Sequence, residues 1–144
     1  MKKLYILLGI GVSLLLMSCH LETSNNGDLD GLWQATIKED IATGEVVDLR
    51  DYQATWSFQG KLVQMNASSI PNHVVGTFIQ TENYLKVDKL SIFTSGKGDE
   101  PISDVAVLEV FGFTKLDETF ELLELNSNAL RLQNDKVRLT FRKY

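Results

Sequence analysis

Short runs in which apolar and polar residues alternate are the feature that most constrains the fold of this chain. In residues 52–58 the apolar positions are Tyr52, Ala54, Trp56 and Phe58. In residues 136–142 they are Val137, Leu139 and Phe141. Because successive side chains of a β-strand point to opposite faces, this period of two predicts strands with one buried face.

Comparable runs follow one another along the chain and are separated by turn-forming residues. The further strands that we expect are 31–38, 61–66, 74–80, 84–90, 120–125 and 129–133. Gln59-Gly60 and Asn134-Asp135 supply turns. The adjacent Leu122 and Leu123 break the alternation, which predicts a β-bulge. Strands in such a series predict an all-β fold, either an antiparallel sandwich or a barrel.

Residues 103–112 carry two competing signals. Ser103 is a suitable N-cap, Asp104 favours a helix N-terminus, and Gly112 sits just past the apolar stretch, which together predict a short helix over 103–111. The valines in the stretch favour a strand instead. We favour the helix, packed over one end of the sheet. The segments 39–51 and 94–101 are expected to be mobile loops.

The N-terminal residues have the composition of a secretory signal peptide. Lys2 and Lys3 precede an apolar stretch from Leu4 to Met17. As a helix these residues would span about 21 Å, which is short of the ~30 Å hydrocarbon core of a bilayer. We therefore interpret residues 1–18 as a signal peptide rather than a permanent transmembrane helix.

Leu16-Met17-Ser18-Cys19 closes the signal and resembles the lipobox of bacterial lipoproteins. The resemblance implies that Cys19 becomes the first residue of the mature protein and carries a diacylglyceryl group and an amide-linked acyl chain such as palmitate. Multiple acyl chains give stable membrane anchoring. Cys19 is also the only cysteine, so no disulfide forms within the chain. Residues 19–27 are polar and turn-rich and are expected to form a flexible tether.

Residues 28–144 remain for one domain. Without the two signal-peptide lysines, twelve basic and nineteen acidic residues give a net charge of −7, which argues against nucleic acid as a partner. Only Glu22 is acidic between Cys19 and Asp28, and position 20 is histidine rather than aspartate. By resemblance to other lipoproteins, this predicts an outer-membrane location facing the periplasm of the cell envelope.

The residue types available for catalysis or metal binding are few. Cys–His catalysis is excluded because Cys19 is the lipid site, and His73 is the only histidine beyond the tether. Zinc sites require three or four nitrogen, sulfur or oxygen ligands, usually His and Cys. We therefore expect no metal, no cofactor and no enzymatic activity. Glu109 stands among apolar residues and is expected to face water if its segment is helical.

Gly31-Leu32-Trp33 resembles the Gly-x-Trp signature of lipocalins. The chain as a whole resembles the small lipocalin-like lipoproteins of Gram-negative bacteria. The features that carry this resemblance are the lipobox, the tether, the Gly-x-Trp motif, the series of strands, Phe111-Gly112-Phe113 and the closing residues 139–144. The resemblance implies an antiparallel barrel. The sequence does not decide whether this barrel is hollow, filled or half-open. It also implies that Trp33 closes the base and that a basic residue near the last strand, Arg138 or Arg142, packs across it.

Two functions remain. In the first, the barrel binds a small apolar or amphipathic ligand, and the residues that line the site are Tyr52, Trp56, Phe58, Phe78 and Phe111. In the second, the domain is a non-catalytic interaction module, an accessory subunit or inhibitor that contacts another envelope protein. A binder should contain a cavity, whereas an interaction module should have a filled core and an exposed patch.

Overall fold

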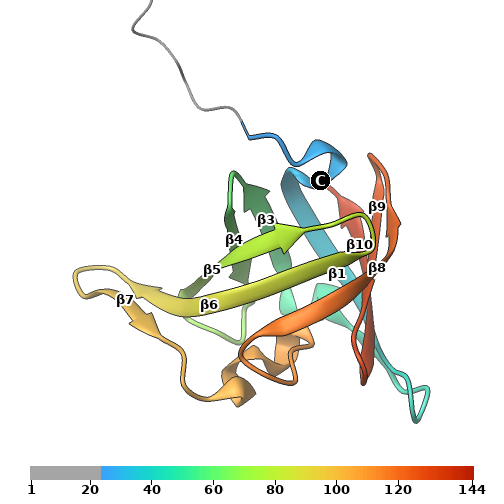
Figure 1. Ribbon diagram of the computed structural model, residues 1–144. Coiled ribbons are helices and arrows are strands. Elements are labelled where there is room, and N and C mark those ends of the chain that lie inside the picture. The colour runs from blue at the N-terminus through green and yellow to red at the C-terminus, as the bar shows by residue number, and fades with distance from the viewer. Residues whose placement is uncertain (1–23) are drawn as a thin grey trace, which may run out of the picture.

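The computed structural model describes residues 24–144, so the predicted signal peptide and Cys19 lie outside the described residues. Eight antiparallel strands form a closed ring in the order β1-β3-β4-β5-β6-β8-β9-β10, and β10 pairs back onto β1 (Figure 1). The strands of the ring are β1 (Gly31–Asp40), β3 (Thr55–Gln59), β4 (Leu62–Asn66), β5 (His73–Gln80), β6 (Tyr84–Thr94), β8 (Glu118–Leu125), β9 (Ala129–Gln133) and β10 (Val137–Lys143).

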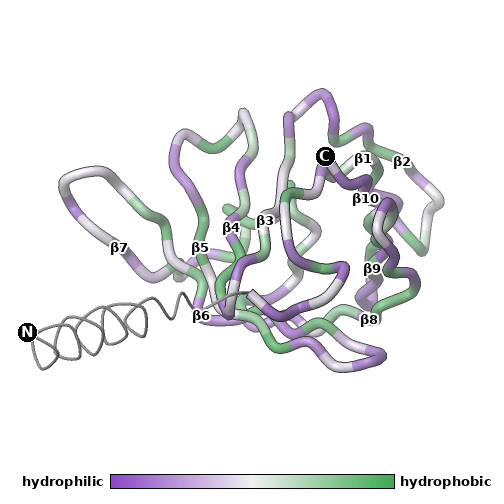
Figure 2. Tube along the Cα trace, turned by 90° about the horizontal axis from the view of Figure 1, so that it is seen from above, coloured by the Kyte–Doolittle hydropathy of each residue, from purple (hydrophilic) through white to green (hydrophobic). Residues whose placement is uncertain are grey.

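The predicted all-β barrel is confirmed, and it is closed rather than half-open. The β1–β10 pairing runs from Trp33 opposite Lys143 to Asp40 opposite Val137. Two short strands lie outside the ring: β2 (Val46–Asp48) pairs with β1, and β7 (Gly98–Pro101) pairs with β6. Along the barrel strands the chain changes repeatedly between hydrophilic and hydrophobic residues, as the alternation in the sequence requires (Figure 2).

Several local predictions hold in detail. Strand β9 has the predicted bounds, and β8 has its register shift between Leu122 and Glu124, where the paired leucines predicted a bulge. Two loop predictions are wrong, because β2 and the 3₁₀ helix η3 (Leu49–Tyr52) occupy part of 39–51, and β7 occupies part of 94–101. Tyr52 is therefore not the first residue of a strand, since Gln53 follows it in the left-handed conformation (φ 50°) and β3 begins at Thr55.

The predicted short helix is present as the 3₁₀ helix η4 (Val105–Phe111). Asp104, rather than Ser103, is the N-cap, and its carboxylate accepts a hydrogen bond from the Ala106 amide. Gly112 ends the helix at φ 83°, a conformation that favours glycine. Helix η4 lies at the opposite end of the barrel from the C-terminus (Figure 1). Within residues 24–144, none of the helices has the length and hydropathy needed to cross a membrane.

The 3₁₀ helix η2 (Gly27–Leu29) lies at the end of the barrel near the C-terminus (Figure 1), and the buried Trp33 at the start of β1 packs against it. The Trp33 indole is fully buried and its Nε1 donates a hydrogen bond to the Leu29 carbonyl at 2.8 Å. Lys143 packs across the ring with its ammonium 4.4 Å from the centroid, and it also donates to the carbonyls of Asp28 and Asp30. This cation thus joins the N-terminal and C-terminal ends of the barrel wall. We call this end the closed end.

The basic residue at Trp33 was predicted as Arg138 or Arg142, and the structure corrects this to Lys143. Arg138 instead pairs with Glu39 at 3.3 Å, and Arg142 donates to Gln34. The side chains of Arg138 and Arg142 lie on the outer face of β10, whereas the Lys143 side chain reaches Trp33 and η2 at the closed end. Gly31 adopts φ 112°, and a Cβ there would lie 3.0 Å from Lys143 Cε, so glycine meets both a backbone and a packing requirement.

Replacing Lys143 with methionine tests this closure. The variant keeps an apolar stem but loses the contact with the Trp33 ring and the hydrogen bonds to Asp28 and Asp30, so we expect a loss of about 1–2 kcal/mol in the free energy of unfolding. Urea denaturation of residues 22–144 measures it. Arg142→Met is the matched control and should change stability by less than about 0.5 kcal/mol. Equal losses in the two variants would contradict the assignment.

Candidate functional site

The barrel interior is filled by side chains, among them four of the five residues predicted to line a ligand site. Trp56, Phe58, Phe78 and Phe111 are all buried, with at most 6 % of their surface exposed. Of the five predicted ligand-lining residues, only Tyr52 is exposed. The four buried rings are therefore part of the hydrophobic core, as is common for inward-facing side chains of small barrels.

Trp56 is the centre of this core. Its ring lies 5.2–6.5 Å, between centroids, from the rings of Phe58, Phe111, Phe113, Phe120 and Phe141. The rings come from β3, η4, β8, β10 and the segment between η4 and β8. Most of these pairs are edge-to-face or tilted, which are favourable arrangements for aromatic rings. A ligand therefore has to be sought at the ends of the barrel.

A groove opens at the end of the barrel where η4 lies, which we call the mouth. Its volume is about 720 Å³. It lies between η4, η3, β2 and the segment before β5. Most of its walls are apolar, from Val47, Leu49, Tyr52, Ile70, Pro71, Ile92, Ala106, Val107 and Val110, and its polar lining residues are Lys38, Ser69, Asn72 and Glu109.

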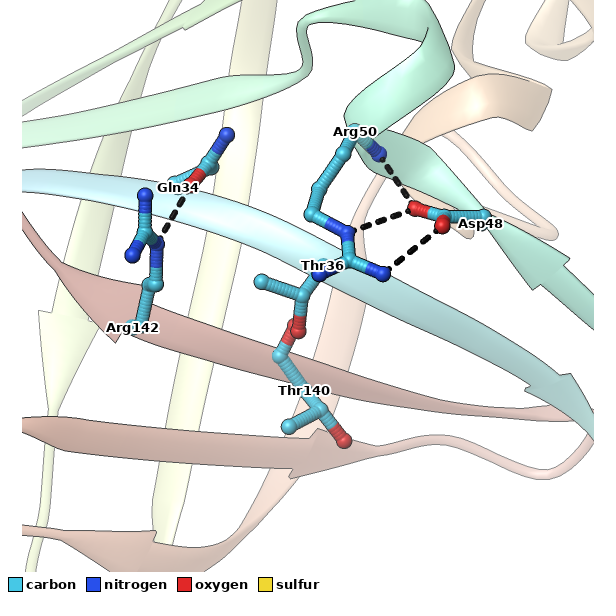
Figure 3. A network of polar contacts seen from close by, with 6 residues as sticks. All are labelled: Gln34, Thr36, Asp48, Arg50, Thr140 and Arg142. Carbon is cyan, nitrogen blue, oxygen red and sulfur yellow. Dashed lines mark hydrogen bonds and ion pairs between the residues drawn. The ribbon is translucent and has the colours of Figure 1, made fainter.

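A β-bulge in β1 directs Lys38 into the mouth. Trp33 and Ala35 point into the core, and simple alternation would continue this with Ile37. The register shifts at Thr36, however, so that Lys38 lies opposite the buried Leu139 and Ile37 is exposed. The Thr36 hydroxyl donates to the Thr140 carbonyl at 3.0 Å across the bulge, and Figure 3 shows these two residues next to each other on β1 and β10. Bulges are a known way to re-aim a side chain.

Lys38 crosses the mouth to η4. Its ammonium donates a hydrogen bond of 2.9 Å to the Glu109 carbonyl. A second hollow of about 460 Å³ lies next to the groove, and Lys38, Val47, Ala106 and Glu109 line both. Lys38 and η4 thus divide the mouth into two compartments. The second compartment is more polar because Asp40, Glu45 and Lys136 also line it.

An ion pair fixes the turn that carries Leu49 and Tyr52 into the groove. The Arg50 guanidinium donates to both carboxylate oxygens of Asp48, at 3.0 and 2.8 Å, and the Arg50 amide donates to the same carboxylate (Figure 3). These side-chain and backbone hydrogen bonds from Arg50 lower the pKa of Asp48 below its ordinary value. Asp48 is the N-cap of η3.

Among residues 24–144 there is no group of three or more His, Cys, Asp or Glu side chains placed to hold a metal ion. His73 begins β5 on the barrel surface and contacts Asn66 and Gln64. Glu109 is exposed, as expected for a helical segment. The buried carboxylate is that of Glu118, which accepts hydrogen bonds from the amide and hydroxyl of Thr114.

Fold and site together define a small antiparallel barrel with a plugged base, a filled interior and an open mouth. Residues 14–144 match the profile of the lipocalin-like domain family. The chain therefore belongs to this family, which confirms the lipocalin-like part of the predicted resemblance. The signal peptide and the lipobox remain predictions, because they lie outside the described residues. A comparison with curated proteins gives no significant match.

Solved structures share the fold at low sequence identity. A lipocalin-like protein from Bacteroides uniformis is 20 % identical with a TM-score of 0.60, and covers 82 % of this chain and 100 % of its own. An uncharacterized protein from Bacteroides eggerthii is 19 % identical with a TM-score of 0.59, over 81 % and 99 %. A protein from Burkholderia xenovorans is 14 % identical with a TM-score of 0.52, over 88 % and 93 %.

The groove residues other than Tyr52 were missed in the sequence for identifiable reasons. Simple alternation from Trp33 places Lys38 on the outer face of the strand predicted over 31–38, and the bulge at Thr36 has no clear sequence signal. Val107 and Val110 lie in the segment where helix and strand signals compete. The conflict between helix and strand signals in residues 103–112 could have pointed to these two groove residues, because a valine-rich helix at the end of a barrel places apolar side chains at the mouth.

Trp56→Ala and Tyr52→Ala distinguish a core residue from a groove residue. Truncation of the buried Trp56 leaves a cavity among five rings, so it should lower the free energy of unfolding by about 3–5 kcal/mol. Tyr52 is 40 % exposed, and its truncation should cost less than about 1 kcal/mol. Urea unfolding of residues 22–144 measures both. A smaller loss for Trp56→Ala than for Tyr52→Ala would contradict the assignment of Trp56 to the core.

Proposed function

We propose that this protein is a lipid-anchored, non-catalytic binding protein that holds a small amphipathic ligand in the groove at the barrel mouth. The observation that carries the proposal is an apolar groove with a single inward-pointing cation, Lys38, against one wall. The ligand meets an apolar surface along most of its length, and the charged residues of the lining are Lys38 and Glu109. The site is concave and mostly apolar, with few polar groups, as small-molecule sites generally are.

The size of the groove limits the ligand. Its volume of about 720 Å³ falls within the usual range of about 300–1,000 Å³ for ligand pockets. The filled interior prevents full enclosure, so part of the ligand stays in contact with solvent. An acyl or other apolar portion packs against Val47, Val107 and Val110, while a polar or anionic group lies near Lys38.

The membrane is the second partner in this proposal. Lipidation at Cys19 holds the barrel at the outer membrane on its periplasmic side, where envelope lipids and their fragments are available as ligands. The similar structures share the fold alone, at 14–20 % sequence identity, so the ligand class rests on the groove. No cofactor or metal takes part.

Native mass spectrometry of residues 22–144, incubated with an extract of envelope lipids and small metabolites, tests the binding. We expect an adduct of discrete mass, whose affinity falls at least tenfold in Val107→Asp because a carboxylate then enters the apolar groove. Val46→Asp is the control, since Val46 is 59 % exposed and does not line the groove. The affinity of the Val46→Asp variant for the same ligand should equal that of the native protein. A well-folded monomer without an adduct would contradict the proposal.

The filled interior also favours a second candidate, a protein-interaction module. A filled core with an exposed apolar patch is typical of such a module. Ile41 lies just before β2 and Val46 begins it, both are exposed, and among the described strands β2 pairs with β1. A partner protein would then contact the mouth. Crosslinking in whole cells from position 46 separates the two functions: a discrete protein conjugate favours the module, and its absence together with a lipid adduct favours the binder.

A further inference from the structure

Six of the twelve large hydrophobic side chains that are exposed among residues 24–144 lie around the closed end of the barrel. They lie at the starts of β1, β4 and β6, at the end of β5, in the last half of β8 and at the C-terminal residue. Their members are Leu32, Leu62, Ile79, Tyr84, Leu123 and Tyr144, and each is more than a third exposed. Ile79 and Tyr144 are the most exposed, at 61 % and 67 %. We call this set the basal rim.

Register pairs show that the basal rim follows the barrel wall. Leu62 lies opposite Thr77 in the β4–β5 pair, two positions from Ile79 on the same outer face. Ile79 lies opposite Lys86, again two positions from Tyr84. On the other side, the Tyr144 amide donates to the Leu32 carbonyl. Large apolar side chains gathered on one surface of a protein mark an interaction site.

A hydrogen-bond network fixes the N-terminal segment to this same end. The Ser24 hydroxyl donates to Asp30 at 2.5 Å and accepts from the Gly60 amide at 2.7 Å. The Asn26 side chain donates to the Gly60 carbonyl and to Asp30. Although burial raises the pKa of Asp30, hydrogen bonds from Ser24 and Asn26 and the charge of Lys143 bring it below its ordinary value. Residues 24–27, expected to be tether, are thus bound to the β3–β4 turn.

The length of chain before this network limits the distance between lipid and barrel. Cys19 lies five residues before Ser24, and five residues span at most about 18 Å when fully extended. Strand β1 alone has ten residues, which corresponds to about 33 Å along the strand and, at the usual tilt of about 40°, to about 25 Å along the barrel axis. A lipid on Cys19 therefore brings the closed end to the membrane surface, and the tether is too short to let the mouth face that surface.

We infer that the basal rim inserts into the headgroup region of the membrane, so that the barrel stands on its closed end and the mouth groove faces away from the bilayer. This inference rests on the proposed lipid anchor at Cys19. The two rim tyrosines suit this position, because tyrosine is enriched at membrane interfaces. Charges of both signs, among them Lys61, Arg142, Glu82 and Glu121, lie near the rim. Insertion therefore depends on the apolar side chains rather than on attraction to anionic lipids.

Single cysteines report the orientation, because Cys19 is the only native cysteine and is occupied by lipid in this proposal. Ile79→Cys on the basal rim and Val46→Cys near the mouth form a matched pair, with 61 % and 59 % of the native side chains exposed. The full lipidated chain, labelled with a nitrobenzoxadiazole dye, is placed in phosphatidylethanolamine–phosphatidylglycerol vesicles with headgroup spin-labelled lipid. We expect quenching at position 79 at least threefold stronger than at position 46. Equal quenching, or stronger quenching at 46, overturns the orientation.

A second variant separates rim insertion from the effect of the tether. In Leu62→Gln/Ile79→Gln/Tyr84→Gln, a dye at Tyr144→Cys should lose at least half of its quenching, whereas Ile41→Gln/Val46→Gln should leave it unchanged. Full quenching in the triple variant would overturn insertion of the rim. Intact-mass measurement of the membrane-extracted protein tests the anchor itself. A chain without added lipid refutes the proposed anchor and this inference together, whereas a lipidated chain with equal quenching refutes only the inference.

Discussion

The contact of Trp56 with five phenylalanine rings is the interaction on which the rest of this structure depends. It draws β3, β8, β10, η4 and the segment after η4 to one point inside the barrel. Because aromatic side chains bury large areas, one such cluster can stabilise a small barrel that has no disulfide among its described residues. The same cluster occupies the space that a hollow barrel would offer to a ligand.

Because the interior is filled, the two ends of the barrel are separate sites with different structures. At the closed end, η2, Trp33 and Lys143 form a plug that joins the first and last strands of the ring. At the mouth, the bulge in β1 and the turn held by Asp48 and Arg50 leave a groove with one inward cation. The lipid anchor and the ligand site that we propose therefore lie at opposite ends, and neither obstructs the other.

The sequence predicts the fold well because one buried face of each strand imposes a period of two, which a single sequence displays. The alternation around Trp56 and Leu139 predicted two ring strands, and the doubled leucines at 122–123 predicted a bulge that the register confirms. Gly31 and Trp33 lie at the barrel base as the resemblance implied. These features are local in the sequence and depend little on distant contacts.

The site was harder to predict because it depends on contacts between distant residues. Whether the ring of Trp56 lines a cavity or fills one depends on rings from residues 111–141, and alternation describes both cases equally. Lys143 rather than Arg138 reaches Trp33, and the carbonyl of Asp28 in η2, which holds the Lys143 ammonium there, is far from it in the sequence. Lys38 enters the mouth through a bulge without a sequence signal, and Tyr52 leaves the strand through the left-handed conformation of Gln53.

Nuclear magnetic resonance under xenon pressure tests the filled interior most directly. Xenon enters empty apolar cavities, and the two tryptophans give two indole N–H signals to follow in ¹⁵N-labelled residues 22–144. Because side chains fill the interior, we expect that the Trp56 indole signal does not move and that any xenon-induced shifts are confined to η3, η4 and the mouth. A shift of the Trp56 indole signal, accompanied by shifts at Phe58 and Phe120, would place a cavity inside the barrel and contradict the account.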